Sequence, residues 1–248
     1  GRIVAAKLIL TGQDVPEIHD TGASAVWPLH GLDWSDAVPT PVSIGRDDVT
    51  EIIFTSGATA DPKGVVITHR NVLANIVPVE REVLKYKKWG RPFFPIRFLN
   101  LLPLSHMFGQ AMSAFIPPML DGVVVFMRGF KPAEIVDQIQ KRRVSVLVSV
   151  PKILDVLRDH VQRSGAPFEP ERPGVKAHVI KRWWRYRRIH RMLGLKFWAF
   201  VVGAAPLEQE LEAFWTELGF AVIQGYGLTE TAPIVTLNHP FGAKRGSV

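Results

Sequence analysis

Small hydroxyl residues, glycine and one lysine are concentrated between Phe54 and Gly64, in the order Phe-Thr-Ser-Gly-Ala-Thr-Ala-Asp-Pro-Lys-Gly. Hydroxyls and free backbone N–H groups donate to phosphate oxygens, glycine lets the backbone approach closely, and lysine adds positive charge. The spacing differs from that of a P-loop, because Pro62 stands where the second glycine should be and Gly64 follows Lys63. The segment predicts a phosphate-binding loop, and a Ser/Thr/Gly turn between two strands is the alternative that composition leaves open.

A second segment, Gln224-Gly-Tyr-Gly-Leu-Thr-Glu230, places an aromatic ring between two glycines, followed by a hydroxyl and a carboxylate. A base could stack on Tyr226, Thr229 could donate to a phosphate, and Glu230 could bind Mg²⁺, which prefers oxygen ligands. Taken alone, this segment is also compatible with a hairpin-like turn that happens to contain a glutamate.

The elements that must position these segments follow an alternating pattern of short apolar runs and helical periods, which is typical of βα units around a mostly parallel sheet. The expected strands cover residues 51–55, 65–68, 98–102, 123–127, 144–148, 198–202 and 220–224. The expected helices begin at residues 69 and 151 or cover 107–119, 131–142 and 207–218. Ligands of open α/β sheets bind beyond the carboxyl ends of strands, where the loops 55–64, 203–206 and 225–231 are expected. The predicted fold class is therefore α/β, with mostly parallel sheets flanked by helices.

Composition sets the broad class of the protein. The 248 residues are 47% hydrophobic and 21% charged, which is typical of a packed globular protein. Cysteine is absent, so disulfides and thiolate metal sites are excluded and a cytoplasmic setting is expected. Gly and Pro punctuate residues 1–47, which are expected to be a loop-rich lead-in, and 48–248 is the expected α/β region. Polar residues and prolines interrupt the charge-free stretch 98–120, which argues against a membrane span.

The two segments and their order make the chain similar to the adenylate-forming superfamily, which includes acyl-CoA synthetases. Phe54–Gly64 resembles its signature T-S-G-(S/T)-T-G-x-P-K-G, and Tyr226–Glu230 its Y-G-x-T-E. Leu102-Pro-Leu-Ser-His-Met-Phe108 and Gly203-Ala-Ala-Pro-Leu207 resemble two further motifs of that family. Among subgroups, the chain most resembles bacterial long-chain fatty acyl-CoA synthetases. This resemblance implies part of a layered αβαβα large domain, with a mobile C-terminal domain beyond the present sequence.

The resemblance also implies roles for individual residues. Lys63, His106, Thr229 and Glu230 would act in catalysis, with Glu230 binding Mg²⁺. Met107, Phe108 and Gly109 would join His106 in binding the acyl group, and Ala111, Met112 and Phe115 would help to wall its tunnel, although ordinary core packing explains any one of them equally well. The residues expected to contact ATP or AMP are Thr55, Ser56, Gly57, Ala58, Thr59, Lys63, Gly203, Ala204, Ala205, Gln224, Gly225, Tyr226, Gly227 and Thr229.

The reaction implied is that of a fatty acid–CoA ligase, in which ATP activates a carboxylate to acyl-AMP and CoA then takes the acyl group. ATP, Mg²⁺ and CoA are the expected cofactors and co-substrates, and this chain alone is expected to be inactive. An acyl-AMP ligase that loads a carrier protein is one alternative. A non-catalytic nucleotide- or lipid-binding module is another, which Ala58 and Ala60 favour because they replace a hydroxyl residue and a glycine of the signature.

The net charge of +7 is concentrated in a basic and aromatic insertion at residues 172–197. Nine Lys and Arg residues and no acid lie between Arg172 and Leu207, so the rest of the chain carries a small negative excess. At 100° per residue, Trp183, Tyr186, Ile189 and Leu193 share one helix face. Such a helix either docks on its own domain or lies on a membrane surface through residues 181–193, which would make the protein peripheral to a membrane. Nucleic acid is the weakest of the three alternatives.

Overall fold

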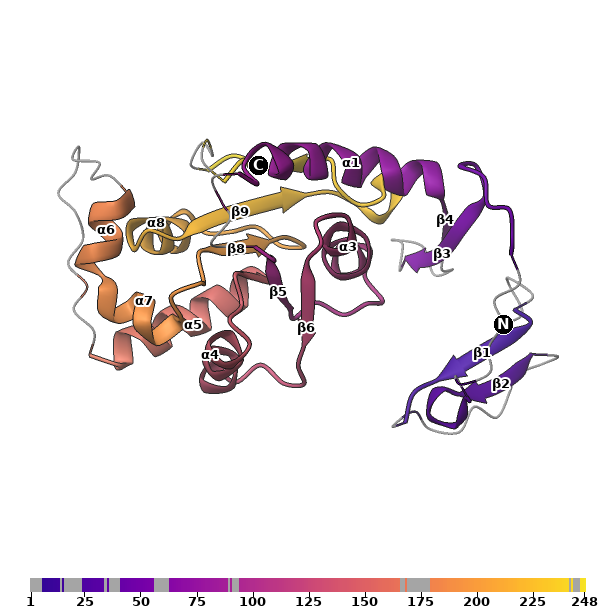
Figure 1. Ribbon diagram of the computed structural model, residues 1–248, viewed down its shortest axis with the longest axis horizontal. Coiled ribbons are helices and arrows are strands. Elements are labelled where there is room, and N and C mark those ends of the chain that lie inside the picture. Colours follow the sequence, from indigo (N-terminus) through magenta and orange to yellow (C-terminus); the bar gives the residue numbers. More distant parts are fainter. Residues whose placement is uncertain are drawn as a thin grey trace. The chain divides into compact units, whose positions relative to one another are not determined.

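The computed structural model describes residues 6–13, 15, 24–33, 35, 41–55, 63–88, 90, 94–165, 168, 179–240, 242 and 246–248 (Figure 1). The chain divides into two compact units, Gly1–Ile44 and Gly45–Val248. In the first unit, strand β1 (Leu8–Thr11) pairs in parallel with β2 (Ala25–Pro28), and a 3₁₀ turn, η1 (Leu29–Gly31), follows. Every predicted functional residue lies in the second unit.

The second unit begins with a hairpin. Strands β3 (Val49–Thr55) and β4 (Lys63–Thr68) pair antiparallel and form a two-stranded sheet of their own, with Phe54 opposite Gly64. The expectation that Lys63 and Gly64 belong to the loop is wrong, because both residues continue the ladder of β4. Helix α1 (His69–Lys85) starts directly after β4, where the side chains of Thr68 and Asn71 cap its first turn.

A six-stranded sheet forms the centre of this unit, in the order β10-β9-β8-β7-β5-β6. All neighbouring strands are parallel except the last pair, in which β10 runs antiparallel to β9. Its strands are β5 (Arg97–Asn100), β6 (Val123–Phe126), β7 (Val146–Ser149), β8 (Ala199–Val202), β9 (Ala221–Tyr226) and β10 (Thr236–Leu237). The prediction of a mostly parallel sheet is confirmed.

Helices cover both faces of the sheet, and alternate strand residues divide between two buried clusters. Leu147 and Phe200 face one cluster, and Val146 and Val201 face the other. The first cluster is covered by α4 (Pro132–Lys141), α5 (Pro151–Arg163), α7 (Arg187–Leu193) and α8 (Gln209–Glu217). The second is covered by α1 and by three consecutive segments, α2 (Met107–Gln110), the π-helical turn η3 (Ala111–Phe115) and α3 (Ile116–Met119). The single helix expected over 107–119 is thus interrupted by a π turn.

In its described residues, 179–197, the basic insertion forms two short helices rather than the one that its periodicity predicts. Helix α6 (Val179–Arg185) ends before Tyr186 and α7 starts after it. Tyr186, Ile189 and Leu193 are buried in the first core cluster, whereas Trp183 and Trp184 are 36% and 64% exposed. Three of the four apolar residues therefore pack on their own domain. In the described part of the chain, no helix combines the length and the apolarity needed to cross a bilayer.

Candidate functional site

The two segments predicted to hold adenine lie side by side at the carboxyl edge of the main sheet. Gly203 directly follows β8, and Gly225 and Tyr226 end β9, with Val202 paired to Gln224. The expected loop 225–231 therefore begins two residues later than predicted, because Gly225 and Tyr226 pair with β10. Gly203 is buried, whereas Ala204, Ala205 and Gly227 are exposed and Tyr226 is 54% exposed. This edge presents exposed backbone and the exposed ring of Tyr226, which suits a planar base.

Phe108 connects the predicted acyl-binding segment to both adenine segments. Its ring would lie only 2.7 Å from a Cβ placed on Gly203 and 3.4 Å from one placed on Gly225. Gly203 therefore provides the room in which this half-buried ring lies, and a Cβ on Gly225 would lie at ordinary contact distance from it. The structure thus brings together residues 203, 225 and 108, which are far apart in the sequence and were assigned to two different subsites.

The loop that carries His106 is shaped by a residue that sequence reasoning missed. The buried side chain of Asn100, at the end of β5, donates to the Leu102 carbonyl and accepts from the Leu102 N–H, both at 3.1 Å. The turn is tight, since a Cβ on Gly109 would lie 2.3 Å from the Pro103 carbonyl oxygen. His106 is exposed at the N-terminus of α2, beyond the carboxyl edge of β5. Its position suits a donor that faces a ligand at this edge.

The residues predicted to wall an acyl tunnel differ in exposure. Met107, Gly109, Ala111 and Met112 are buried, and Met107 and Met112 belong to the second core cluster. Phe108 and Phe115 are only partly buried and pack against that cluster. Core packing accounts for the buried members, so Phe108 and Phe115 are the two side chains with surface available to a ligand.

Thr229 and Glu230 lie in a short 3₁₀ turn, η4 (Thr229–Thr231), that follows β9. The Thr231 hydroxyl closes this turn by accepting from the Leu228 N–H at 2.9 Å and lying 2.8 Å from the Leu228 carbonyl. Glu230 is exposed and Thr229 is half-buried. Thr231 was missed because it lies one residue beyond the recognised motif, although a hydroxyl near a turn is a known local signal.

Glu230 offers one carboxylate to a magnesium ion that would arrive with a nucleotide. Within the described ranges, no group of three or more His, Asp or Glu side chains is placed to hold a metal ion. Mg²⁺ is often held by one or two carboxylates and by substrate phosphates, and the exposed Glu230 can supply one carboxylate. Glu230 would therefore be one ligand among phosphate oxygens and water.

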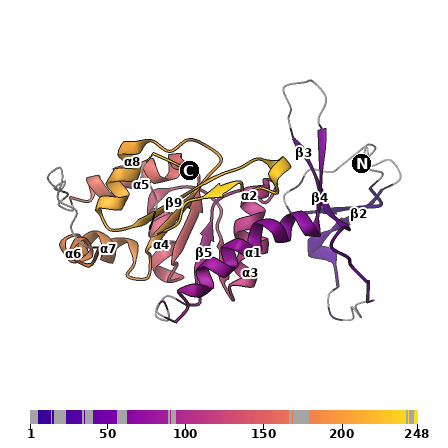
Figure 2. The same ribbon diagram turned by 90° about the horizontal axis from the view of Figure 1, so that it is seen from above.

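The hairpin β3–β4 holds the two ends of the predicted phosphate loop, and it leads straight into α1 (Figure 2). Thr55 and Lys63 are paired across its ladder. The loop positions Ser56, Gly57, Ala58 and Thr59 lie outside the described residues, so their phosphate contacts stay a prediction. On strand β3 of the hairpin, burial raises the pKa of the Glu51 carboxyl, an effect that a hydrogen bond with the Gln110 side chain opposes.

Comparisons with known proteins place the chain among AMP-binding enzymes. The model of the family described as "AMP-binding enzyme" matches residues 3–248. A feruloyl-CoA synthase from Amycolatopsis sp. is 26% identical over 208 residues, which cover 83% of this chain and 35% of that protein. The long chain acyl-CoA synthetase 1 of Arabidopsis thaliana is 26% identical over 213 residues, or 78% of this chain and 32% of that protein. The chain therefore spans about a third of the length of the curated relatives it matches.

A solved structure extends this similarity to the fold. The inhibitor-bound N-terminal domain of FACL13 from Mycobacterium tuberculosis matches with a TM-score of 0.56 and 26% identity, over 81% of this chain and 42% of that one. The relatives named above act on different acids, so they support the chemistry of acid–CoA ligation more strongly than any one acid.

Proposed function

The chain belongs to the AMP-binding enzyme family, and from this premise we propose that it supplies the nucleotide side of the active site of an ATP-dependent acid–CoA ligase. In this reaction a carboxylate oxygen attacks the α-phosphate of ATP, which gives acyl-AMP and releases pyrophosphate. The thiol of CoA then displaces AMP and forms the thioester. The observation that carries the proposal is the meeting of the Gly203 segment, the end of β9 and the Phe108 ring at one edge of the sheet.

Each segment has a role in the proposed reaction. The hairpin loop, with Thr55 and Lys63 at its ends, would hold the β- and γ-phosphates. Adenine would lie on the open edge formed by Gly203, Ala204 and Ala205 and by Gln224, Gly225, Tyr226 and Gly227. Thr229 would contact the α-phosphate, and Glu230 would bind the Mg²⁺ that accompanies ATP. His106 would donate to the oxygens that gain negative charge as the carboxylate attacks.

A fatty acid is the substrate that we propose for the whole protein. The relatives support it in part, because long-chain acyl-CoA synthetases stand among them beside a feruloyl-CoA synthase. The partly buried ring of Phe108 offers apolar surface next to the proposed nucleotide edge, and Phe115, on the same helical segment, is also only partly buried. Apolar surface of this kind suits an apolar acyl chain. CoA is the proposed acceptor, and an acyl-AMP ligase that loads a carrier protein is the alternative.

Calorimetry of Mg·ATP binding to this chain tests the nucleotide site. We expect binding that weakens about tenfold in Glu230→Gln, since a lost charge-assisted contact corresponds to roughly that factor. Glu210→Gln is the matched control, because it removes the same charge from an exposed position in the first turn of α8. Equal affinities for wild type and Glu230→Gln would contradict the role of Glu230. Absence of any Mg·ATP binding would favour a non-catalytic module over a ligase.

Pyrophosphate exchange separates binding from turnover. We propose that the chain by itself does not adenylate palmitate, because it spans about a third of the length of the relatives it matches. In the assay, labelled pyrophosphate would be followed into ATP in the presence of palmitate and Mg²⁺. Robust exchange by residues 1–248 alone would overturn this expectation.

The exposed face of α6 and α7 supports a further part of the proposal, which is contact with an anionic membrane surface by an otherwise cytoplasmic enzyme. Trp184, Arg187, Arg188 and Arg191 are exposed there, whereas Tyr186 is buried. A tryptophan beside several arginines favours the interface of an anionic bilayer. Flotation with vesicles that contain anionic lipid tests this contact, using a variant in which the four exposed residues are changed to Ala. Equal flotation of both proteins would refute it.

A further inference from the structure

Asn75, on the second turn of α1, makes a two-sided contact with the loop that follows β9. Its side-chain Nδ2 donates to the Thr231 carbonyl at 3.0 Å, and its Oδ1 accepts from the Ile234 N–H at 2.6 Å. The amide is half-buried and its partners lie 156 and 159 residues away in the sequence. Figure 1 shows α1 beside this segment. One side chain thus satisfies two backbone groups of a single loop.

This loop, residues 227–235, is the one that carries Thr229 and Glu230. Two contacts within the loop hold its conformation: the hydrogen bond of the Thr231 hydroxyl to the Leu228 carbonyl, and the close approach of Gly227 to the Pro233 carbonyl. Those contacts leave the Thr231 carbonyl and the Ile234 N–H to be satisfied from outside, and Asn75 supplies both partners. A partly buried backbone group that loses its partner is costly, so the loop depends on Asn75 for this conformation.

The helix that carries Asn75 is also the direct continuation of the phosphate hairpin. Helix α1 starts one residue after β4 ends, and its first turn is locked by the reciprocal bonds between Thr68 and Asn71. The turn η4 is itself in contact with β4. Asn75 therefore joins the strand that starts at Lys63 to the turn that carries Glu230, through one and a half turns of helix.

We propose that Asn75 is a positioning residue that holds the Thr229–Glu230 turn in register with the phosphate-binding hairpin. This inference rests on the proposed function. It assigns the hairpin to the β- and γ-phosphates of one Mg·ATP, and the Thr229–Glu230 turn to the α-phosphate and the Mg²⁺ of the same ligand. Asn75 touches neither nucleotide nor metal in this assignment, and it acts through the Thr231 and Ile234 backbone. Its loss should weaken Mg·ATP binding more than binding of metal-free ATP, since Glu230 is the proposed metal ligand.

Hydrogen exchange of this chain reports the contact directly. In Asn75→Ala we expect the Ile234 amide to exchange at least about tenfold faster, whereas amides in the second half of α1 keep their protection. Asn75→Asp keeps an acceptor for the Ile234 N–H and loses the donor to Thr231, so Ile234 should stay protected. The matched control is Asn238→Ala, which removes a different asparagine bond to a backbone carbonyl, that of Ser247 at 2.8 Å. It should leave Ile234 unchanged.

Calorimetry on the same proteins tests the positioning role. We expect the Mg·ATP dissociation constant to rise about tenfold in Asn75→Ala, to rise less in Asn75→Asp and to stay at the wild-type value in Asn238→Ala. Unchanged exchange at Ile234, or faster exchange with unchanged Mg·ATP affinity, would overturn the inference. If the wild-type chain bound no Mg·ATP, the proposed function would fail and the positioning role with it. The exchange at Ile234 would then still distinguish a real contact from an absent one.

Discussion

The ring of Phe108 lies so close to Gly203 that a Cβ on the glycine would be 2.7 Å from the nearest ring carbon. The two residues come from different predicted subsites, one expected to bind the acyl group and the other to bind adenine. Because of this contact, the position of the Phe108 ring and the backbone conformation of the turn after β8 cannot change independently. The acyl side and the nucleotide side of the proposed site therefore meet at this pair.

A methyl group at position 203 should displace the Phe108 ring. We expect Gly203→Ala to lower the free energy of unfolding by about 1–3 kcal/mol, which is typical of overpacking. In a Phe108→Ala background the same substitution should cost much less, because the ring that it meets is gone. Urea denaturation of the four proteins of this double-mutant cycle measures the coupling. Additive effects would show that Phe108 is not what limits the size of residue 203.

Ala204, next in the chain, has a left-handed backbone with a φ of 65°. An L-residue with a side chain loses about 1 kcal/mol or more in this conformation, whereas glycine adopts it freely. Ala204→Gly should therefore raise the free energy of unfolding by up to about 1 kcal/mol, after the greater entropy of glycine in the unfolded chain is subtracted. Ala205→Gly is the control, since Ala205 is also exposed but has no positive φ. It should destabilise instead, and a stabilising effect of both changes would exclude backbone strain as the cause.

His190 should make the stability of the insertion depend on pH. Its buried ring stacks on Phe220 and its Nε2 lies 2.8 Å from the Leu218 carbonyl, while Nδ1 has no hydrogen-bond partner among the described residues. Burial lowers the pKa of His190, and the bond to Leu218 opposes this shift only in part. Because the folded pKa lies below the unfolded value of about 6.5, stability is complete above that value and is lost as the pH falls through the folded pKa.

The pH effect can be isolated with His190→Gln, which keeps a side-chain donor but does not titrate. At pH 7.5 we expect the substitution to cost about 1–2 kcal/mol, because the stacked ring is lost. Between pH 7 and pH 5 the unfolding free energy of the wild type should fall more steeply than that of the variant, as measured by urea denaturation at each pH. Equal slopes would mean that His190 does not carry the dependence.

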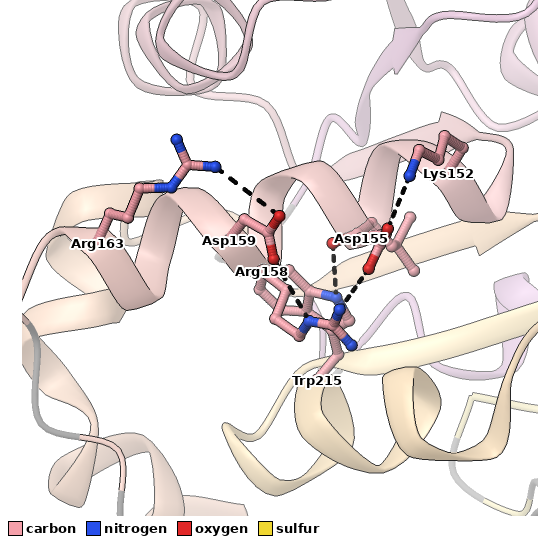
Figure 3. Close-up of polar contacts among 7 residues, drawn as sticks. Lys152, Asp155, Arg158, Asp159, Arg163 and Trp215 are labelled. Atoms are coloured by element: carbon pink, nitrogen blue, oxygen red, sulfur yellow. Dashed lines mark hydrogen bonds and ion pairs between the residues drawn. The ribbon is translucent and has the colours of Figure 1, made fainter.

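The ion pairs on α5 should contribute far less to the free energy of unfolding than Trp215, a buried side chain of α8. Figure 3 shows Asp155 between Lys152 and Arg158. The Asp155 carboxylate oxygens lie 3.0 Å from Lys152 Nζ and 2.5 Å from the Arg158 guanidinium. On α8, Trp215 Nε1 donates to the Leu154 carbonyl of α5 at 3.3 Å. The bond from Lys152, followed by the positive charge of Arg158, lowers the pKa of the Asp155 carboxyl. The stabilisation that it gives is therefore present above the ordinary pKa of an aspartate and disappears as the pH falls through the lowered value.

Two substitutions measure this difference. Asp155→Asn should cost less than about 1 kcal/mol, and the loss should shrink further in 1 M salt, because the pair is accessible to solvent. Trp215→Phe should cost about 2–3 kcal/mol at any salt concentration, since it leaves a cavity in the core and removes the bond to Leu154. Chemical denaturation at low and high salt gives both numbers. A larger or salt-independent cost for Asp155→Asn would contradict this ranking.

The sequence predicted the elements better than the contacts between them. Short apolar runs located five of the six strands of the main sheet, as in the fully buried run Val146–Ser149. The two-residue strand β10 was not predicted, because so short an element carries no such run. Apolar periodicity also identified Tyr186, Ile189 and Leu193 as one apolar face. The same pattern could not tell whether that face meets lipid or the protein's own core, because both environments select the same residues. The break at Tyr186 was missed for a related reason, since no Gly or Pro marks it.

The candidate site was predictable where a motif is contiguous and unpredictable where it depends on tertiary contacts. Thr229 and Glu230 stand within a recognisable run of residues. Asn75 stands in the middle of a helix, and its hydrogen-bond partners are more than 150 residues away, so no local signal indicates its role. Asn100 is similar, because an asparagine at the end of a strand only becomes informative once the following loop folds back on it.

Gly227 gives the sharpest test of how the Thr229–Glu230 loop is held. A Cβ at this position would lie 1.5 Å from the Pro233 carbonyl oxygen and 2.7 Å from the Pro233 carbonyl carbon, which are backbone atoms that cannot swing aside. Gly227→Ala should therefore force the loop open and lower the free energy of unfolding by about 1–3 kcal/mol. Gly242→Ala is the control, since the nearest atom to its added Cβ would be 3.6 Å away and its φ is not positive.

The Gly227 substitution and the Asn75 contact act on the same loop from opposite sides, so their effects should not add. If Gly227→Ala has already opened the loop, the further change Asn75→Ala should cost little, in stability or in exchange at the Val235 amide, which bonds to the Tyr226 carbonyl at 2.9 Å. Thermal unfolding and hydrogen exchange of the two single variants and the double variant decide this. Full additivity would show that the close approach at Gly227 and the bonds of Asn75 stabilise separate parts of the chain, whereas a small second effect would show that both maintain one conformation of the turn that carries Glu230.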